Sequence, residues 1–592
     1  MMERNCLVFN FADIEVRERE FLLIKAGERL PVEPTAFRVL LFLLRNAGRI
    51  VSKEEIVASV WNDVAVSDNS LTRAIAQLRR VLDDDPREPR YILTVPTLGY
   101  RFLCDVKVAE ESVGAIRSPR SDQGIHSLAV LPFANGTGPA EAEYLSEGIS
   151  ESIINLLSQF PDLRVVPRTS AFRCKGLEAD LKRVGRDLNV DVVLTGAVVQ
   201  RGDRLIVQTE LTDIGNEAQI WGGQYNRRLE DIFELQEELA RRISESLRPR
   251  LTPDEDKLLS RRPTENREAY LLYLKAIYHA NKWSPDGIQK GISYSKQAIE
   301  ADPLFAEAYA GLAYIYSLLG IFGGLPPLQA FPLAKSAALR ALEIDDTVAN
   351  AHACLTYLLL AYDWDWAGAE RESRRAMELG PNLPGGHYVR SQWCLLNGRS
   401  DEAIAEARKT LELDPLSLPN YQLLAGTYYM LGEFDSAIEQ LHQALQLDSS
   451  FIPARQMLAL SYAFKGSHHE ALAEAAIAAS PSAGKSQTDI HARGIWGIIH
   501  AVAGKEAEAR RALAMLIEYQ QPSDYLSPIY CAAIHALLDE KDEAFQWIEK
   551  ARPGRGLWEL RIRPEFRALH IDPRFPDLLR QIGFPLTKGD GS

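Results

Sequence analysis

Hydrophobic and polar positions in the first hundred residues predict three amphipathic helices. Apolar residues recur at helical spacing between Pro34, which suits a first helical turn, and Gly48, which suits a C-terminal stop. The run Ser-Lys-Glu-Glu at residues 52–55 is a capping box that predicts the start of a second helix. A third helix is predicted from Asp68 to about Leu82. Its apolar residues lie at steps of 4, 3 and 4 along one buried side: Leu71, Ile75, Leu78 and Leu82.

The opposite side of this third helix carries side chains that suit contact with DNA. These positions are Asn69, Arg73, Ala76, Gln77 and Arg80, and the interval from 69 to 80 holds three arginines and no acidic residue. A helix of about 15 residues is roughly 22 Å long and fits the major groove, where Arg reads guanine and Gln reads adenine. An alternative interpretation of Arg79 and Arg80 is that they are solvated charges at the end of the helix.

A β-hairpin is predicted directly after this helix. Residues 91–95 have the composition of a strand, residues 96–99 of a turn, and residues 100–103 of a returning strand. A recognition helix followed by a hairpin is the winged-helix arrangement. Residues 1–105 are therefore predicted to form a winged-helix DNA-binding domain, and residues 106–125, rich in Ser, Gly and charge, a flexible linker.

The middle of the chain, residues 126–250, alternates apolar runs with amphipathic segments and predicts an α/β domain. Strands are expected at 127–133, 163–167, 191–199, 204–212 and 219–225, and helices at 145–160, 180–188 and 230–247. The carboxylates of this domain, Glu147, Glu151 and Asp191, lie on polar faces or strand ends without a nucleophile–base arrangement, and there is no Gly-rich phosphate loop. A sensor site for a small molecule or peptide in this domain stays open.

A repeat pattern fills the last part of the chain. Four segments with the composition of a helix end finish at Pro381, Pro415, Ser449 and Pro481, which are 34, 34 and 32 residues apart. A 34-residue period is that of tetratricopeptide repeats, and we expect about six of them between 266 and 550. An insertion at 321–331 is expected in an inter-helix turn, and a closing helix at 566–584. Such arrays bind peptides or proteins on a concave face; the alternative is a scaffold or dimerisation surface without a specific peptide ligand.

Three segments follow one another in the order and spacing of a known domain: VSKEEIVASVWND, VSDNSLTRAIAQLRRVLDDD and YILTVPTLGYRF. They resemble the OmpR/PhoB family of winged-helix transcriptional regulators over residues 1 to about 104. The resemblance implies a four-stranded N-terminal sheet, three helices and a C-terminal hairpin. It implies that Arg73, Ala76 and Gln77 face bases. It assigns the phosphate backbone to Asn69, Ser70, Arg79, Thr94 and Tyr100, and Arg80 and Thr97 complete the predicted DNA-binding set.

Further segments carry a second resemblance: AVLPF, YLSEGISESIINLL, DVVLTGAVVQRGDRLIVQTELTD and IWGGQYNR resemble the TolB-like (FlgO-like) module, which often stands beside tetratricopeptide arrays in bacterial regulators. As a whole the chain resembles CadC- and HilA-like regulators. The predicted fold class is multidomain α+β, with a winged helix-turn-helix (1–105), a TolB-like α/β module (126–250) and an all-α tetratricopeptide solenoid (264–585).

Charge modifies the DNA-binding prediction. The whole chain has a formal net charge of −14, and residues 1–107 hold 16 Lys and Arg against 16 Asp and Glu. The wing tip, residues 96–98, lacks the basic residue that the family usually places before the Gly-Tyr pair. Because phosphate contacts dominate affinity for DNA, we expect one copy to bind weakly and a homodimer or tandem sites to be used.

Composition argues against several other classes of protein. Hydrophobic residues at 46% and charged residues at 25% are typical of folded soluble protein. The six cysteines are scattered without a CxxC pair, and His468-His469 lacks further ligands, so neither a disulfide framework nor a metal site is expected. No apolar run approaches the roughly 20 residues that span a bilayer. We therefore expect a cytoplasmic protein without a membrane segment, metal or cofactor.

The preferred hypothesis is a one-component transcriptional regulator that binds double-stranded DNA and uses its repeats for a protein, peptide or signal. RNA polymerase is a further possible partner. The alternative is a cytoplasmic repeat scaffold whose winged helix mediates protein contacts. An enzyme is the third hypothesis, and no catalytic residue is predicted.

Overall fold

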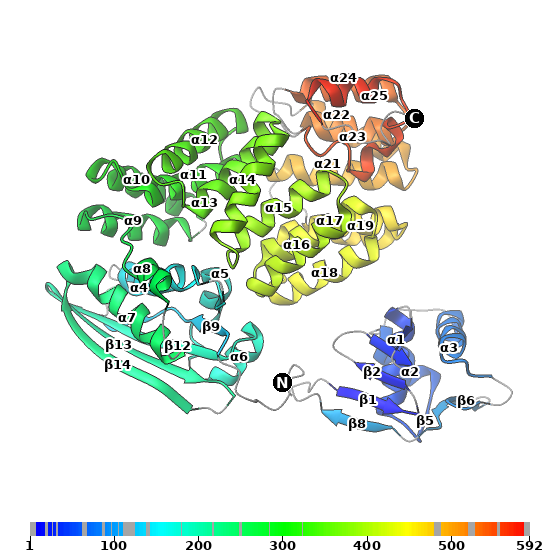
Figure 1. The fold of residues 1–592 in the computed structure, drawn as a ribbon. Helices are drawn as coiled ribbons and strands as arrows, with labels where there is room; N and C mark the ends of the chain where they lie inside the picture. The colour runs from blue at the N-terminus through cyan, green and yellow to red at the C-terminus, as the bar shows by residue number, and fades with distance from the viewer. Residues whose placement is uncertain are drawn as a thin grey trace. The chain divides into compact units, whose positions relative to one another are not determined.

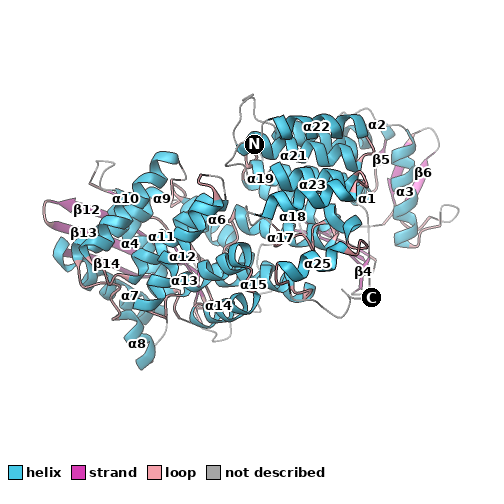
Figure 2. Cartoon of the chain, turned by 90° about the horizontal axis from the view of Figure 1, so that it is seen from above, coloured by secondary structure: helices cyan, strands magenta, loops and turns pink. Residues whose placement is uncertain are grey.

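The computed structural model describes most of the chain. Its described residues are 7–12, 14–17, 22–25, 28–30, 34–61, 68–85, 89–95, 98–104, 106–110, 125–137, 143–160, 162–178, 180–215, 218–247, 252–282, 284–321, 324–478, 487–518, 527–552 and 557–584. The chain divides into two compact units, Met1–Gln123 and Gly124–Ser592. The elements of both are labelled in Figure 1, and strands are confined to the first unit and to the start of the second (Figure 2).

The first unit begins with an antiparallel sheet of strand order β4-β3-β2-β1-β8. Its strands are β1 (Leu7–Phe11), β2 (Ile14–Arg17), β3 (Leu22–Lys25), β4 (Glu28–Leu30) and β8 (Lys107–Glu110). The four expected N-terminal strands are present, but the sheet has a fifth: β8 pairs with β1, with Val108 opposite Phe9. The segment predicted as a linker from residue 106 therefore starts with a strand. The partner strand β1 lies about a hundred residues earlier, so no local sequence pattern could indicate this pairing.

Three helices and a small second sheet complete this unit. The helices are α1 (Pro34–Arg45), α2 (Lys53–Trp61) and α3 (Asp68–Leu82), and the strands are β5 (Ile50–Val51), β6 (Ile92–Val95) and β7 (Gly99–Phe102) in the order β5-β7-β6. The predicted helices and hairpin are confirmed. One core joins both sheets to α1 and α3, with Phe9, Phe37 and Phe102 among its fully buried side chains.

The second unit starts with a mixed sheet of order β11-β9-β12-β13-β14, with β10 paired to β12. Strands β11, β9 and β12 are parallel, whereas β12, β13 and β14 form an antiparallel meander. The strands are β9 (Ser127–Val130), β10 (Ala134–Asn135), β11 (Arg164–Val165), β12 (Val192–Arg201), β13 (Arg204–Asp213) and β14 (Ala218–Arg228). The helices are α4 (Glu143–Leu157), α5 (Arg168–Ala171), α6 (Leu181–Leu188), α7 (Ile232–Leu247) and α8 (Pro253–Leu259).

The rest of the unit is an array of antiparallel helix pairs. Among the described residues there are eight pairs, from α9–α10 to α23–α24, so the count of about six was too low. The first helices α13, α15, α17 and α19 begin at Ala349, Pro384, Leu418 and Ile452, which is a period of 34 or 35 residues. Tetratricopeptide periodicity is thereby confirmed in the centre of the array. Pairs at its two ends carry weaker sequence signals, which explains the undercount.

The array helices that precede Pro381, Pro415 and Ser449 each end two residues before those predicted positions. The helices of the array are α9 (Arg267–Ala280), α10 (Pro285–Ala301), α11 (Ala306–Ile321), α12 (Pro327–Ile344), α13 (Ala349–Leu358), α14 (Trp366–Leu379), α15 (Pro384–Leu396), α16 (Ser400–Leu413), α17 (Leu418–Leu431), α18 (Phe434–Leu447), α19 (Ile452–Lys465), α20 (His468–Ala478), α21 (Gln487–Val502), α22 (Glu506–Glu518), α23 (Ser527–Leu537) and α24 (Lys541–Ala551). The insertion at 321–331 does span the turn between α11 and α12, but its last five residues already belong to α12.

The α/β domain and the array form one body rather than two tethered domains. The Asn382 amide donates to the Phe160 carbonyl at 3.0 Å, and the Leu416 N–H donates to Ser170 Oγ at 2.7 Å. The Tyr270 hydroxyl of α9 hydrogen-bonds Gln236 Oε1 of α7 at 2.9 Å. These contacts fix the first and central repeats against the sheet domain.

Two features of the described residues bear on function. None of their helices is both long and apolar enough to cross a membrane. Within the same residues, no group of three or more His, Cys, Asp or Glu side chains is placed to hold a metal ion. Trp366 and Trp393 are buried in the core of the array.

Candidate nucleic-acid interface

Helix α3 presents one side to the core and the other to solvent. The predicted seam is buried: Leu71 and Ile75 are 2% exposed, and Leu78 and Leu82 fully buried. On the opposite side Ala76 and Arg80 are exposed and Gln77 is half-buried. Because the seam fixes the rotation of the helix about its axis, the side predicted to meet DNA is the one that the unit leaves uncovered.

Several predicted DNA-binding residues cannot be followed beyond the backbone. Asn69, Ser70 and Arg73 belong to the first part of α3, and their side chains lie outside what the structure describes. Thr97, at the wing turn, lies outside the described residues altogether. Their roles stay predictions.

Arg79 connects the recognition helix to the wing. Its Nη2 donates to the Ile92 carbonyl and to Thr94 Oγ1, both at 2.8 Å. Because the Ile92 carbonyl belongs to the backbone of β6, this hydrogen bond fixes the distance between β6 and α3 independently of the side chains of the strand. The sequence predicted Arg79 and Thr94 as separate phosphate contacts, whereas the fold brings the two side chains together.

Asp84 closes the turn between α3 and the wing. The residue is 5% exposed, and its carboxylate accepts hydrogen bonds from three successive backbone N–H groups, those of Arg90 at 2.6 Å, Tyr91 at 3.0 Å and Ile92 at 2.9 Å. Its own N–H donates to the Arg79 carbonyl at 2.8 Å. The residue before it, Asp83, has a φ of 58°, a left-handed conformation that Asp and Asn tolerate.

The returning strand of the wing packs tightly on the rest of the unit. Gly99 has a φ of +136°, and a Cβ at this position would lie 2.0 Å from the Val51 carbonyl oxygen. Next to it Tyr100, a predicted phosphate contact, is only 5% exposed and belongs to the core. At the wing tip Leu98 is 57% exposed. The described residue of the wing tip is therefore an exposed apolar side chain, near the position where the family pattern usually places a cation.

Helix α2 is held by the predicted capping box. The Ser52 N–H donates to Glu55 Oε2 at 2.8 Å, and the Glu55 N–H donates to Ser52 Oγ at 3.1 Å. The backbone hydrogen bond from Ser52 lowers the pKa of the Glu55 carboxyl. This cap satisfies two backbone or side-chain partners at the start of α2 and fixes where that helix begins.

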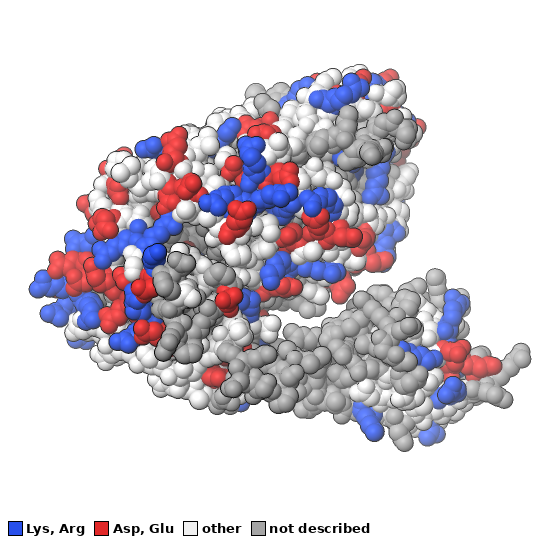
Figure 3. Space-filling model, in the orientation of Figure 1, with Lys and Arg blue, Asp and Glu red and all other residues white. Residues whose placement is uncertain are grey.

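Surface charge agrees with the balanced count of the first unit. On the face drawn in Figure 3, basic and acidic side chains are interleaved over both units, and neither sign covers a broad continuous area of the described surface.

Two family models match the chain. Residues 27–102 match the transcriptional regulatory protein, C-terminal family, and residues 124–242 match the second domain of HilA/YgeH-like transcriptional regulators. The first match covers the helices and wing described above, and the second covers the α/β domain. The winged-helix resemblance of the sequence is thus confirmed, and the α/β domain is similar to the second domain of HilA/YgeH-like regulators.

The curated relatives are named mostly as regulators. The transcriptional regulator HilA of Salmonella typhi is 27% identical over 332 residues, which is 55% of this chain and 56% of the relative. Putative adenylate cyclase 3 of Rhizobium meliloti is 32% identical over 243 residues, 40% of each chain. The chain thus spans about half the length of the curated relatives it matches.

Solved structures similar to parts of the chain fall into two groups. The Klebsiella pneumoniae RstA DNA-binding domain, solved in complex with the RstA box, is 26% identical, with a TM-score of 0.16, and covers 16% of this chain and 96% of that one. A tetratricopeptide protein of Thermus thermophilus is 17% identical, with a TM-score of 0.28, and covers 32% of this chain and 96% of that one.

Proposed function

We propose that this protein is a DNA-binding transcriptional regulator of the one-component type. The observation that carries the proposal is the uncovered side of α3 next to a wing that Arg79 and Asp84 hold in place, within residues that match a transcriptional regulatory family. A helix in this setting enters the major groove, and the wing lies beside it. The proposal places the protein in the cytoplasm, with access to chromosomal DNA.

The proposal divides the interface into two kinds of contact. Arg73, Ala76 and Gln77 face base edges, and Asn69, Ser70, Arg80, Thr94, Thr97 and Tyr100 serve the backbone. Arg79 contributes mainly by positioning the wing, since its Nη2 is already engaged within the unit. Because Tyr100 is nearly buried, its contribution is limited to what its hydroxyl edge or backbone offers.

Affinity is proposed to come from more than one copy. A formally neutral unit with an apolar wing tip has few cations for phosphate, so a homodimer on paired half-sites compensates for weak single contacts. The repeat array is proposed as the site of a protein or peptide partner, and RNA polymerase as a further contact of the bound regulator.

The proposal assigns no catalytic role to the α/β domain. Its buried carboxylates are engaged in structural contacts: Glu147 and Glu151 pair with Arg168 at 2.7 and 3.0 Å. Asp191 Oδ2 accepts from Ser127 Oγ at 2.8 Å and from the Ser127 N–H at 3.1 Å. These bonds leave the three acids holding helices and strands together.

The test is selection of DNA from a genomic pool by the full chain, followed by binding at several salt concentrations. The proposal expects an enriched motif and an affinity that falls linearly with salt on logarithmic axes. Substituting Arg73→Ala or Gln77→Ala should relax preference at one or two positions of the motif, by about 1–3 kcal/mol per base pair, while Arg80→Ala should weaken all sequences alike. Retention of DNA without an enriched motif would refute sequence-specific regulation. Absence of salt-sensitive duplex binding would favour the repeat scaffold instead.

A further inference from the structure

The helix pairs of the array do not stack as a straight column. The first helices of neighbouring pairs contact each other along the series from α11 to α23, whereas the described second helices make no contacts of similar extent with one another. Helices crowd on the inner side of a curved array and spread on the outer side. The first helices therefore form the inner face, the surface on which such arrays take peptides.

The segment Leu557–Phe584, which follows the last pair, lies on this inner face. Its Trp558 ring meets Tyr357 of α13 edge to face, with centroids 6.1 Å apart. Further along the segment, Arg567 Nη2 donates to the Met430 carbonyl of α17 at 3.3 Å. The segment is not a ninth helix pair, since it contains one 3-10 stretch (Pro564–Leu569) and one short helix, α25 (Arg574–Gln581).

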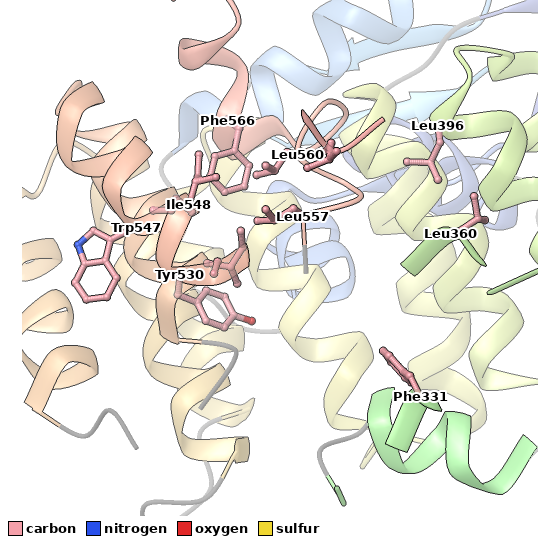
Figure 4. Close-up of a cluster of buried hydrophobic side chains, with 14 of the residues drawn as sticks. Phe331, Leu360, Leu396, Tyr530, Trp547, Ile548, Leu557, Leu560 and Phe566 are labelled. Carbon is pink, nitrogen blue, oxygen red and sulfur yellow. The ribbon is translucent and has the colours of Figure 1, made fainter. Parts of the chain in front are cut away.

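Apolar side chains of the segment join distant repeats. Leu557, Leu560 and Phe566 are at most 1% exposed and share one cluster with Leu360 and Leu396 of the third and fourth pairs and Tyr530 and Ile548 of the eighth. Figure 4 shows the three segment residues between these two groups. The far end closes on the third pair, where the Phe584 ring lies 4.4 Å from that of Trp366. One segment thus fills the space that the curved array encloses.

The centre of the segment is polar. Arg563 Nη2 lies 2.6 Å from Glu565 Oε1, and the Glu565 side chain is fully buried. Both partners belong to the segment itself, so the segment brings a neutralised pair of charges into the array. A buried ion pair adds little net stability compared with an apolar pair, because desolvation offsets the attraction. The chemistry that the segment presents to the inner face is therefore an Arg–Glu pair flanked by apolar and aromatic side chains.

We propose that the inner face is a binding site for an extended protein segment with an Arg–Glu pair between aromatic side chains, and that residues 557–584 occupy it in cis. A partner protein that offers the same chemistry then engages the array by displacing this segment. The inference rests on the proposed role of the array as a partner site. It does not depend on DNA binding by α3.

The experiment uses the full chain and a fluorescent peptide of residues 557–584. A loosened chain carries Trp558→Ala, Arg567→Ala and Phe584→Ala, and a matched control chain carries Arg580→Ala, since Arg580 is exposed and pairs only within the segment, with Asp577. The peptide should bind the loosened chain at least tenfold more tightly than the wild-type or control chain, because the competing cis segment is weakened. A peptide with the same three substitutions should lose at least tenfold in affinity.

Equal affinity for all three chains, or no binding to a folded loosened chain, overturns the proposal. If the loosened chain does not fold, hydrogen exchange of the wild-type chain decides. Amides of 564–582 should exchange well before those of α21 and α23, through opening of the segment alone. Exchange of all these amides together overturns displacement. DNA selection by the same wild-type chain is scored separately, so failure of the proposed regulator function is distinguishable from failure of this inference.

Discussion

Removing the Asp84 carboxylate should release the wing from the recognition helix. Asp84 accepts three backbone N–H bonds from the chain that enters β6, and only 5% of it is exposed. In Asp84→Ala all three donors lose their acceptor in a place where water has little access. The helix itself should remain, because its apolar seam does not involve this side chain.

The magnitude follows from the bonds that are lost. Hydrogen bonds to a charged group are worth about 1.5–3 kcal/mol each, and partial relaxation of the turn returns some of this. We therefore expect a local destabilisation of about 3–5 kcal/mol, a large share of the roughly 5–15 kcal/mol that stabilises a typical domain. At about 1.4 kcal/mol per factor of ten, exchange of the affected amides should accelerate roughly 10²- to 4 × 10³-fold.

Hydrogen exchange with mass spectrometry on the full chain measures this directly. The amides of residues 90–95 should exchange faster in Asp84→Ala, while those of α1 change much less. The matched control is Asp83→Asn, which removes a neighbouring charge from an exposed residue whose left-handed φ of 58° Asn accepts. If Asp84→Ala leaves the exchange of residues 90–95 within twofold of wild type, the structural role argued here for Asp84 is refuted.

Three further perturbations test other parts of the molecule. Gly99→Ala should lower the free energy of unfolding by several kcal/mol, since its Cβ would lie 2.0 Å from the Val51 carbonyl oxygen. Gly48→Ala, at a φ of +79° with open space around it, should lower it by about 1 kcal/mol. Equal losses of stability in urea unfolding would contradict this. Arg79→Lys should weaken binding to all duplexes alike by loosening the wing, and a change in the selected motif would instead indicate a base contact. Burial raises the pKa of Asp414 to about 6, so the fold favours its protonated form. The free energy of unfolding of the second unit should therefore fall by about 2–3 kcal/mol as the pH rises from about 4 to 6. Asp414→Asn should remove that fall from the pH profile of unfolding.

Sequence patterns predicted the elements of the interface well but not the connections between its side chains. Helix α3 and its buried seam follow from spacing, and the Ser52–Glu55 capping box from four adjacent residues, because both depend on neighbours along one helix. The bond from Arg79 to Thr94 spans 15 residues and two elements. A long polar side chain with several possible partners gives no local sign of which one it takes, so sequence alone left Arg79 as a phosphate contact.

The repeat array shows the same division at a larger scale. The sequence predicted the 34-residue period, the alanine-rich helices and the similarity to tetratricopeptide arrays. These features are visible along the chain because each helix pair must bury the same positions against its neighbour. The number of pairs was underestimated where repeats at the ends depart from the pattern. The fate of the last residues was missed more fully: 566–584 was expected to close the array as a helix, and it lies on the inner face instead.

The sequence by itself determined which segments are helices and strands, which faces they bury, and that a winged helix precedes an α/β domain and a repeat array. Those properties depend on short-range periodicity, which the order of residues contains directly. Only the tertiary structure decided that β8 completes the first sheet, that Asp84 and Arg79 hold the wing, and that residues 557–584 pack against the inner face of the array. Each of these contacts joins residues that belong to different elements, and their pairing depends on how whole elements pack rather than on the periodicity of any one element.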